Sequence, residues 1–293
     1  MLKIIYLIIS FLLICQSFYC QSDYPLKEIE EFGENPGNLR MYIYKSGKDS
    51  AKIPLVVMLH GCGENANAVA ELSGWNKLAY LNNFLMLYPQ QKGANNPNSC
   101  FNWFLKKDIE KGSGENESIF EMISYLQKKY NVDTTQIFIS GLSAGAAMSI
   151  VMSATHPQLF KSAAVFAGGA YKSATNAFQA VKVMRGNVNY SDTALVRFVK
   201  EQNPNYTGAY PKLIIYHGIN DGVVDYRNSK YLVSQWAGLH QIDTIADKET
   251  KAYAGIKDIT KWEYNNALGE NKINLYLINN LGHRLMVKRQ KRR

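Results

Sequence analysis

The stretch Ile137-Phe138-Ile139-Ser140-Gly141-Leu142-Ser143-Ala144-Gly145-Ala146-Ala147-Met148 predicts a strand, a sharp turn and a helix, with a serine at the tip of the turn. Residues 137–139 are β-branched or aromatic, and residues 144–154 carry no charge. The Gly-x-Ser-x-Gly turn is typical of an elbow that exposes a serine hydroxyl from a strained backbone. We expect Ser143 to be a nucleophile and the N–H of Ala144, at the helix N-terminus, to face an oxyanion. The alternative is a structural turn without chemistry.

A serine hydroxyl attacks well only when an imidazole takes its proton and a carboxylate orients that imidazole. Asp221 follows a predicted strand at 213–216, and His283 follows one at 273–278. Both therefore lie in loops beyond the carboxyl ends of strands, where a parallel sheet gathers its functional residues. The chain order Ser143, Asp221, His283 is that of the α/β hydrolases. The sequence predicts a catalytic triad of these three residues.

The predicted roles of Asp221 and His283 each have an alternative interpretation. Asp221 lies in an Asn-Asp-Gly turn, so the alternative is a purely structural aspartate, with Asp225 as the substitute acid. His283 has the alternative of an ordinary loop histidine. We expect His60 and His217, each followed by glycine at a strand end, to shape their loops. No Cys or His spacing typical of metal ligands occurs, so we expect no metal site.

A second oxyanion donor is expected in the loop His60-Gly61-Cys62-Gly63, whose glycines let the backbone approach a substrate carbonyl. The N–H of Cys62 is our choice. Without the first 20 residues, Cys62 and Cys100 are the two cysteines that remain. We expect them to form a disulfide, with two buried free thiols as the alternative. The bond would bring Trp103 and Phe104 to the edge of the site as candidates for substrate contact, although aromatic residues in such positions belong to the core as often.

Residues 1–20 predict a secretory signal peptide, because Lys3 precedes the apolar run 4–14 and polar residues follow. The run is too short to indicate a membrane span, so we expect no stable membrane anchor. The protein is therefore expected to be secreted, to the periplasm or the extracellular medium. Lipidation of Cys15 or Cys20 is a weaker alternative, since neither cysteine follows a small residue.

Strands and helices alternate through residues 21–283, which predicts one α/β catalytic domain with a mostly parallel central sheet and helices on both faces. Among the expected elements are a helix at 68–81 and a strand at 84–88 that ends before Pro89. Residues 170–210 are less regular and are expected to form a small cap with helices at 177–184 and 192–200.

The net charge of +9 is concentrated at the end of the chain. Residues 284–293 carry six of these positive charges and Lys3 a seventh, so the remainder carries only +2. We expect residues 284–293 to form a solvated basic tail. Nucleic-acid binding is not expected.

Six segments combine these residues in one order: Leu59-His60-Gly61-Cys62-Gly63-Glu64, Asn98-Ser99-Cys100-Phe101-Asn102-Trp103-Phe104, residues 141–148, Ala167-Gly168-Gly169-Ala170-Tyr171, His217-Gly218-Ile219-Asn220-Asp221 and Gly282-His283. The series resembles that of secreted poly(3-hydroxybutyrate) depolymerases and the related feruloyl and acetylxylan esterases, over about residues 38–283. The resemblance implies an α/β-hydrolase fold, hydrolysis of carboxylic esters without a cofactor, and Ser143, Asp221 and His283 as the triad.

The resemblance leaves the ester open. We expect a small or polymeric ester substrate, with hydroxyalkanoate or short-chain esters ahead of feruloyl or acetyl esters of polysaccharides. Family members usually continue well past the catalytic histidine, whereas only residues 284–293 follow His283 here. If the C-terminus is truncated or misread, we expect His283 to be weakly anchored and activity to be reduced. The remaining alternatives are a peptidase and a non-catalytic binding protein on the same fold.

Overall fold

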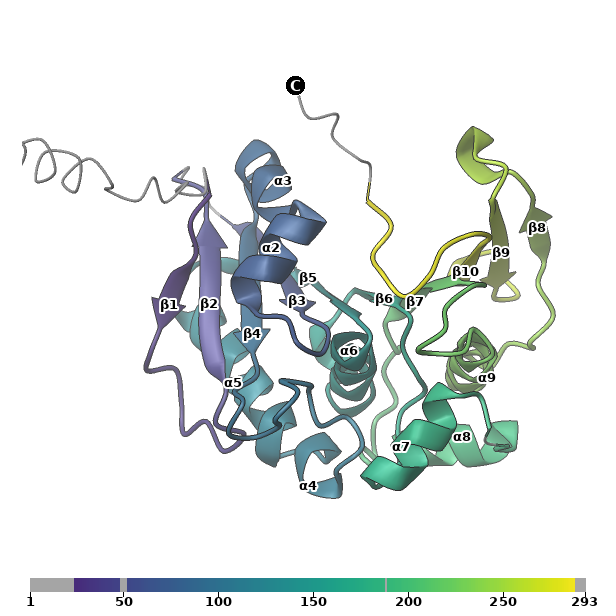
Figure 1. Ribbon diagram of the computed structural model, residues 1–293, viewed down its shortest axis with the longest axis horizontal. Coiled ribbons are helices and arrows are strands. Elements are labelled where there is room, and N and C mark those ends of the chain that lie inside the picture. The colour runs from purple at the N-terminus through teal and green to yellow at the C-terminus, as the bar shows by residue number, and fades with distance from the viewer. Residues whose placement is uncertain (1–23, 48–51, 188, 288–293) are drawn as a thin grey trace, which may run out of the picture.

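The computed structural model describes residues 24–47, 52–187 and 189–287. These residues form a ten-stranded sheet in the order β1-β2-β4-β3-β5-β6-β7-β10-β9-β8 (Figure 1). Neighbouring strands from β4 to β10 pair in parallel, whereas β1 and β2 at one edge and β9 and β8 at the other join by antiparallel pairing. The predicted mostly parallel sheet is confirmed.

The elements follow each other along the chain as strands alternating with helices. The strands are β1 (Lys27–Ile29), β2 (Arg40–Lys45), β3 (Ile53–Leu59), β4 (Leu85–Gln90), β5 (Val132–Leu142), β6 (Ser162–Phe166), β7 (Lys212–Gly218), β8 (Lys248–Thr250), β9 (Ile259–Asn265) and β10 (Asn271–Ile278). The α-helices are α2 (Ala66–Ser73), α3 (Trp75–Asn82), α4 (Lys106–Ile109), α5 (Gly114–Lys129), α6 (Ala144–Thr155), α7 (Ala177–Met184), α8 (Asp192–Lys200) and α9 (Asn228–His240).

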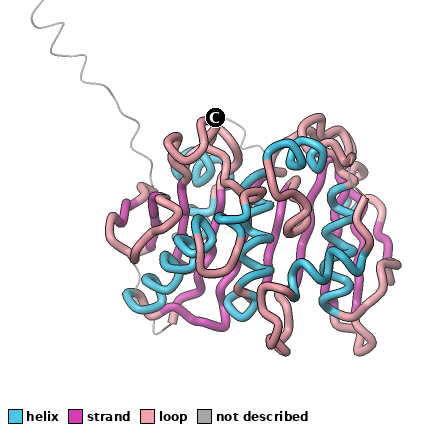
Figure 2. The backbone as a smooth tube through the Cα atoms, turned by 90° about the horizontal axis from the view of Figure 1, so that it is seen from below, coloured by secondary structure: helices cyan, strands magenta, loops and turns pink. Residues whose placement is uncertain are grey.

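The two faces of the sheet bury different helices, because side chains alternate along a strand. On β3, Val56 and Met58 pack in a cluster with residues of α2 and α3. Leu55, Val57 and Leu59 point the other way, into the main core with residues of α5, α6, α8 and α9. Figure 2 shows helices running beside the strands along the width of the sheet. Helices therefore cover both faces, as predicted.

The structure corrects two predicted boundaries. The single helix expected at 68–81 is two helices, because Gly74 adopts φ 70° and ends α2 where α3 begins. The strand expected to stop before Pro89 continues to Gln90. It can do so because β4 pairs with β3 only as far as Leu87, and beyond that point it has β2 alone as a neighbour.

The helices expected at 177–184 and 192–200 are confirmed as α7 and α8. The predicted signal peptide lies outside the described residues, as do residues 288–293 of the basic tail. Within the described part of the chain, no helix has the length and apolar character needed to cross a membrane.

Candidate active site

Ser143 lies between β5 and α6 in the geometry expected of an elbow. Its backbone has φ 56° and ψ −119°, a strained combination that its N–H supports by donating to the carbonyl of Phe166 at 2.9 Å. A side chain on Gly141 would collide with the backbone of Gly145, and one on Gly145 would collide with the carbonyl of His60. Both glycines are therefore required for the tight packing of strand, turn and helix.

The acid and base predicted from the sequence lie side by side. Asp221 follows β7 and His283 follows β10, and these two strands are neighbours in the sheet. The Nδ1 of His283 lies 2.8 Å from Oδ2 of Asp221. The other carboxylate oxygen, Oδ1, accepts the N–H groups of Val223 and Val224, each at 2.9 Å. The Asp221 side chain is fully buried, whereas that of His283 is 19% exposed.

These contacts decide the charge of Asp221. Burial acts to raise the pKa of its carboxyl, but the hydrogen bond to His283 and the two backbone N–H groups lower it by more. The pKa of Asp221 lies below its ordinary value as a result. The group is therefore a carboxylate at neutral pH and keeps the proton of His283 on Nδ1.

His217 lies beside Asp221 and holds the loop that carries it. Its Nε2 donates to the carbonyl of Val224 at 2.9 Å and lies 3.7 Å from Oδ2 of Asp221. Burial lowers the pKa of His217, so the ring is neutral. The expectation that His217 shapes its loop agrees with this geometry.

The loop that carries His283 packs closely against the end of β7. A side chain on Gly218 would collide with the carbonyl of Leu281, and the N–H of Ile219 donates to the carbonyl of Ile278 at 3.0 Å. Beyond the histidine, Leu285 is 6% exposed and packs in the cluster formed by β3 and α2. His283 is thus held on both sides, in contrast to the weak anchoring expected from the short C-terminus.

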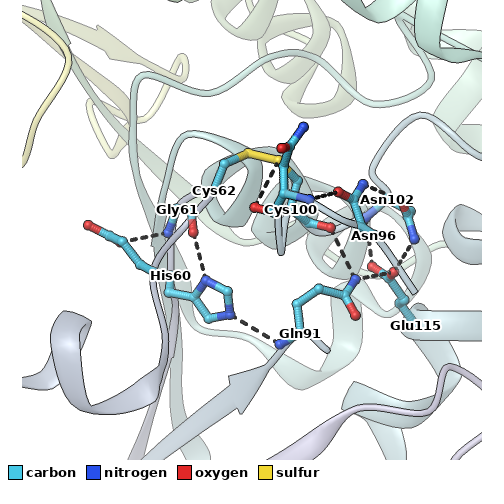
Figure 3. The surroundings of a disulfide bond; sticks show 10 residues. His60, Gly61, Cys62, Gln91, Asn96, Cys100, Asn102 and Glu115 are labelled. Carbon is cyan, nitrogen blue, oxygen red and sulfur yellow. Dashed lines mark hydrogen bonds between the residues drawn. A yellow bond between two sulfur atoms is a disulfide. The ribbon is translucent and has the colours of Figure 1, made fainter. Parts of the chain in front are cut away.

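The loop after β3 carries Cys62, which forms a disulfide with Cys100 (Figure 3). The predicted pairing is confirmed. His60 braces the same loop: its Nε2 accepts the N–H of Gln91 at 3.1 Å, so its Nδ1 carries the proton and donates to the carbonyl of Gly61 at 2.7 Å. Cys62 and Ser143 line the same two cavities. The N–H of Cys62 thus belongs to a loop that the disulfide and His60 both hold beside Ser143.

Behind the disulfide lies a buried carboxyl group that the sequence analysis did not identify as functional (Figure 3). Glu115, in the first turn of α5, is 0% exposed. Its Oε1 accepts from the side-chain amides of Gln91 and Asn102 at 2.5 and 2.6 Å, and its Oε2 accepts the N–H of Asn102 at 2.8 Å. Gln91 also donates to the carbonyl of Cys100 at 3.1 Å. Glu115 therefore fixes both segments that brace the loop of Cys62.

Glu115 predicts a specific pH dependence of stability. Burial raises the pKa of its carboxyl to about 8. In the unfolded chain that pKa is about 4.3. Between these values the folded protein holds a proton that the unfolded chain has lost, so stability falls as pH rises towards 8 and levels off above it. Glu115→Gln removes this contribution.

We expect the melting temperature of Glu115→Gln to rise relative to the wild type as the pH increases from 5 to 9. Glu71→Gln is the control, because Glu71 is exposed and its replacement should leave the wild-type pH profile unchanged. Thermal unfolding across this pH range is the measurement. Parallel curves for Glu115→Gln and the wild type would contradict the assignment.

Two cavities open at Ser143. The wider one, about 770 Å³, is lined by His283, Ser143, Cys62 and the segment 97–100. The narrower one, about 40 Å³, is also lined by Ser143 and Cys62, together with Ala144, residues 167–169, α7 and Asn228. Both thus share Ser143, and only the wider one is lined by His283.

Of the two aromatic residues predicted to contact substrate, only Trp103 lines a cavity at Ser143. Trp103 is 8% exposed and lines the narrow cavity. Phe104 packs edge-on behind it, with ring centroids 5.5 Å apart, and lines neither cavity at Ser143. Two further lining residues, Met184 of α7 in both cavities and Asn228 in the narrow one, carry no local sequence signal of a functional role.

Comparison with known proteins gives one consistent set of similarities. The family model described as "Esterase PHB depolymerase" matches residues 39–255. The chain is 37% identical over 262 residues to poly(3-hydroxyalkanoate) depolymerase C of Paucimonas lemoignei, covering 89% of this chain and 62% of that protein. It is 33% identical to a probable acetylxylan esterase A of Neosartorya fischeri, covering 78% and 62% of the two chains. It is 28% identical to feruloyl esterase B of Talaromyces stipitatus, covering 78% and 65%.

Among solved structures, the acetyl xylan esterase from Aspergillus awamori superposes with a TM-score of 0.81 at 24% identity, covering 88% of this chain and 94% of that one. This likeness confirms the predicted α/β-hydrolase fold. The chain spans a little under two thirds of the length of these three relatives.

Proposed function

Because the chain belongs to the esterase PHB depolymerase family, we propose that it is a serine esterase that hydrolyses carboxylic esters through Ser143, His283 and Asp221. The observation that carries the proposal is the arrangement around one groove. A serine in a strained elbow and a histidine hydrogen-bonded to a buried carboxylate line the same cavity. This is the set of groups that acyl transfer to a serine requires.

The mechanism follows from where the protons lie. Asp221 keeps a proton on Nδ1 of His283, so Nε2 is free to accept the proton of Ser143 as its Oγ attacks the ester carbonyl. The oxyanion that forms accepts hydrogen bonds from the N–H groups of Cys62 and Ala144. His283 then gives the proton to the leaving alcohol. A water molecule attacks the acyl-enzyme by the same route and releases the acid and Ser143.

The position of His283 indicates which cavity takes the alcohol portion of the ester and which takes the acyl portion. The leaving alcohol receives its proton from His283, so the alcohol portion of the ester occupies the wide groove that His283 lines. The acyl chain then occupies the narrow cavity, which lacks the imidazole and contains Trp103 and Ala144. A groove of about 770 Å³ accommodates several units of a polymer, whereas the acyl cavity accommodates one small group.

The acyl cavity favours short acyl groups. One water molecule needs roughly 10–15 Å³ of such space, so about 40 Å³ holds about three water-sized groups. An acetyl group is well within this size, and a hydroxybutyryl chain, with one more non-hydrogen atom beyond its carbonyl than a butyryl chain, is at its limit, whereas an aromatic feruloyl group exceeds it. We therefore place hydroxyalkanoate esters first, in keeping with the relative named poly(3-hydroxyalkanoate) depolymerase C. Acetyl esters of polysaccharides come second, in keeping with the relative named acetylxylan esterase A.

A series of p-nitrophenyl esters tests this acyl preference. We expect kcat/KM to be highest from acetyl to butyryl and to fall at least about tenfold by octanoyl, because extra methylenes must displace packed side chains at about 1–3 kcal/mol. Initial rates across the series are the measurement. A rate that rises steadily to octanoyl would contradict the assignment of the narrow cavity to the acyl chain.

The esterase proposal itself is tested by residues 21–293 acting on p-nitrophenyl butyrate, with and without a fluorophosphonate. We expect turnover that stops when one phosphonyl group is bound per protein, with the modified peptide containing Ser143. A folded protein that neither turns over the ester nor reacts with the fluorophosphonate would instead support a non-catalytic binding protein.

We also propose that the protein is secreted. The predicted signal peptide and the disulfide between Cys62 and Cys100 support this location, since disulfides persist in oxidising compartments.

A further inference from the structure

Asn228, the first residue of α9, has one side-chain atom without a partner. The residue is 1% exposed. Its Nδ2 donates to the carbonyls of Val183 and Asp225 at 2.8 and 2.9 Å. These two acceptors fix the orientation of the amide, because a rotated amide would place its oxygen against two carbonyl oxygens. The Oδ1 atom is buried, and none of the described residues donates a hydrogen bond to it.

The residue that carries this oxygen belongs to the wall of the acyl cavity. Asn228 lines that cavity together with Gly169 and Ser143. A Cβ atom built on Gly169 would lie 3.7 Å from a methyl group of Val183, 3.8 Å from the hydroxyl oxygen of Ser173 and 4.0 Å from Oδ1. The Ser173 hydroxyl donates to the carbonyl of Ala170 at 2.7 Å, so it does not supply a donor to Oδ1. The space in front of Oδ1 is therefore the space that the absent side chain of Gly169 leaves open.

The remainder of the cavity is apolar. Trp103, Ala144, Ala147, Val183, Met184 and Val224 contribute to its walls. A buried acceptor without a donor costs about 1–3 kcal/mol, and in an apolar cavity a ligand hydroxyl that supplies the donor removes that cost. An acyl chain of carbon and hydrogen alone leaves the cost in place. The cavity thus discriminates by the presence of a hydroxyl group as well as by size.

We propose that Asn228 Oδ1 accepts a hydrogen bond from a free hydroxyl on the acyl group, so that the site prefers 3-hydroxyacyl esters to plain acyl esters of the same length. The proposal rests on the esterase function and on the assignment of the narrow cavity to the acyl chain. In a 3-hydroxyalkanoate oligomer, only the unit at the hydroxyl end has a free hydroxyl on its acyl part. The site would therefore release units one at a time from that end.

Asn228 also holds the end of α7 through its Nδ2, so a replacement of Asn228 alone disturbs structure as well as recognition. Gly169→Ala avoids this difficulty. Its methyl group makes only ordinary van der Waals contacts and leaves both bonds of Nδ2 intact, while it covers Oδ1. Asn228→Leu is the second variant, since it removes the acceptor altogether.

The experiment compares ethyl butyrate with the two enantiomers of ethyl 3-hydroxybutyrate, by titration of the released acid. We expect the wild type to prefer one hydroxy ester by about 10- to 100-fold in kcat/KM. Gly169→Ala and Asn228→Leu should reduce that ratio to near 1. A purely structural role would change kcat/KM for all three esters equally and leave their ratio at the wild-type value.

The outcomes separate this inference from the esterase proposal. If the wild type hydrolyses ethyl butyrate and both variants keep the wild-type ratio of kcat/KM between the hydroxy ester and ethyl butyrate, Asn228 does not bind the acyl hydroxyl. The esterase function then stands. If the wild type hydrolyses none of the three esters, the esterase function fails first. An oligomer assay gives a further check, since internal cleavage that yields dimers and trimers before monomer would overturn release from the hydroxyl end.

Discussion

Replacing Ser143 with alanine is expected to lower kcat for p-nitrophenyl butyrate by about 10⁵- to 10⁶-fold, because loss of the nucleophile removes the covalent route. The fold should persist, since alanine retains the N–H bond to Phe166 and fits the same turn. Initial rates and thermal unfolding of the two proteins measure the two effects separately.

Ser140→Ala is the matched control for this variant. Ser140 lies on the same strand, and its Oγ donates to the carbonyl of Ala164 at 2.7 Å. Its loss should cost stability of about 1 kcal/mol and change kcat by no more than a few-fold. Equal losses of activity in Ser140→Ala and Ser143→Ala would show that the site responds to any disturbance of β5, and the assignment of Ser143 as nucleophile would fail.

Asp221→Asn is expected to lower kcat by about 10⁴-fold, for a reason that this structure makes specific. The N–H groups of Val223 and Val224 bind Oδ1 and will hold the single oxygen of the asparagine there. The amide NH₂ must then face Nδ1 of His283. Nδ1 must then accept the hydrogen bond from the amide, so the imidazole proton moves to Nε2. With Nε2 protonated, the imidazole can no longer accept the proton of Ser143.

Asp225→Asn is the control, since Asp225 is the alternative acid in the sequence. The structure pairs its carboxylate with the half-exposed Arg227 at 2.8 Å. An exposed pair of this kind contributes about 0–1 kcal/mol, so kcat should stay within a few-fold of the wild type. The comparison of kcat for the two variants identifies the acid. A larger loss in Asp225→Asn than in Asp221→Asn would reverse the assignment.

The sequence was most informative where a local pattern coincides with a structural constraint. The strand expected at 273–278 lies within β10, and the helices expected at 177–184 and 192–200 coincide with α7 and α8. The elbow was readable because its glycines pack against the backbone of neighbouring segments, which permits no other residue type. The proximity of Asp221 and His283 could be predicted because both follow strands that a parallel sheet brings together at one edge.

Features that depend on packing between distant segments could not be predicted from local sequence patterns. Gly74 divides a continuous helical pattern, because glycine in a helix is compatible with either an interior position or an end. Leu285 is in a segment dominated by positive charge, so its burial against β3 and α2 gives no local signal. Glu115 has the sequence context of a solvated residue in a first helical turn, and its burial depends on Gln91 and Asn102 from another part of the chain.

The proposed role of Asn228 in acyl-group specificity could not be predicted from the sequence either. As the start of a helix it is unremarkable in sequence. Its importance arises because α7 supplies a carbonyl to its Nδ2 and Gly169 leaves space before its Oδ1. Both partners are distant in the chain, so only the folded structure reveals the acceptor.

The most direct test of the esterase account is a crystal structure of the protein after reaction with diethyl p-nitrophenyl phosphate. The tetrahedral phosphorus stands in for the tetrahedral carbon that forms when an ester is attacked. We predict a phosphoryl group bonded to Oγ of Ser143, with its free oxygen accepting from the N–H groups of Cys62 and Ala144. Nε2 of His283 should lie within hydrogen-bond distance of an ester oxygen. An adduct on another residue, or a phosphoryl oxygen pointing away from both N–H groups, would contradict the account.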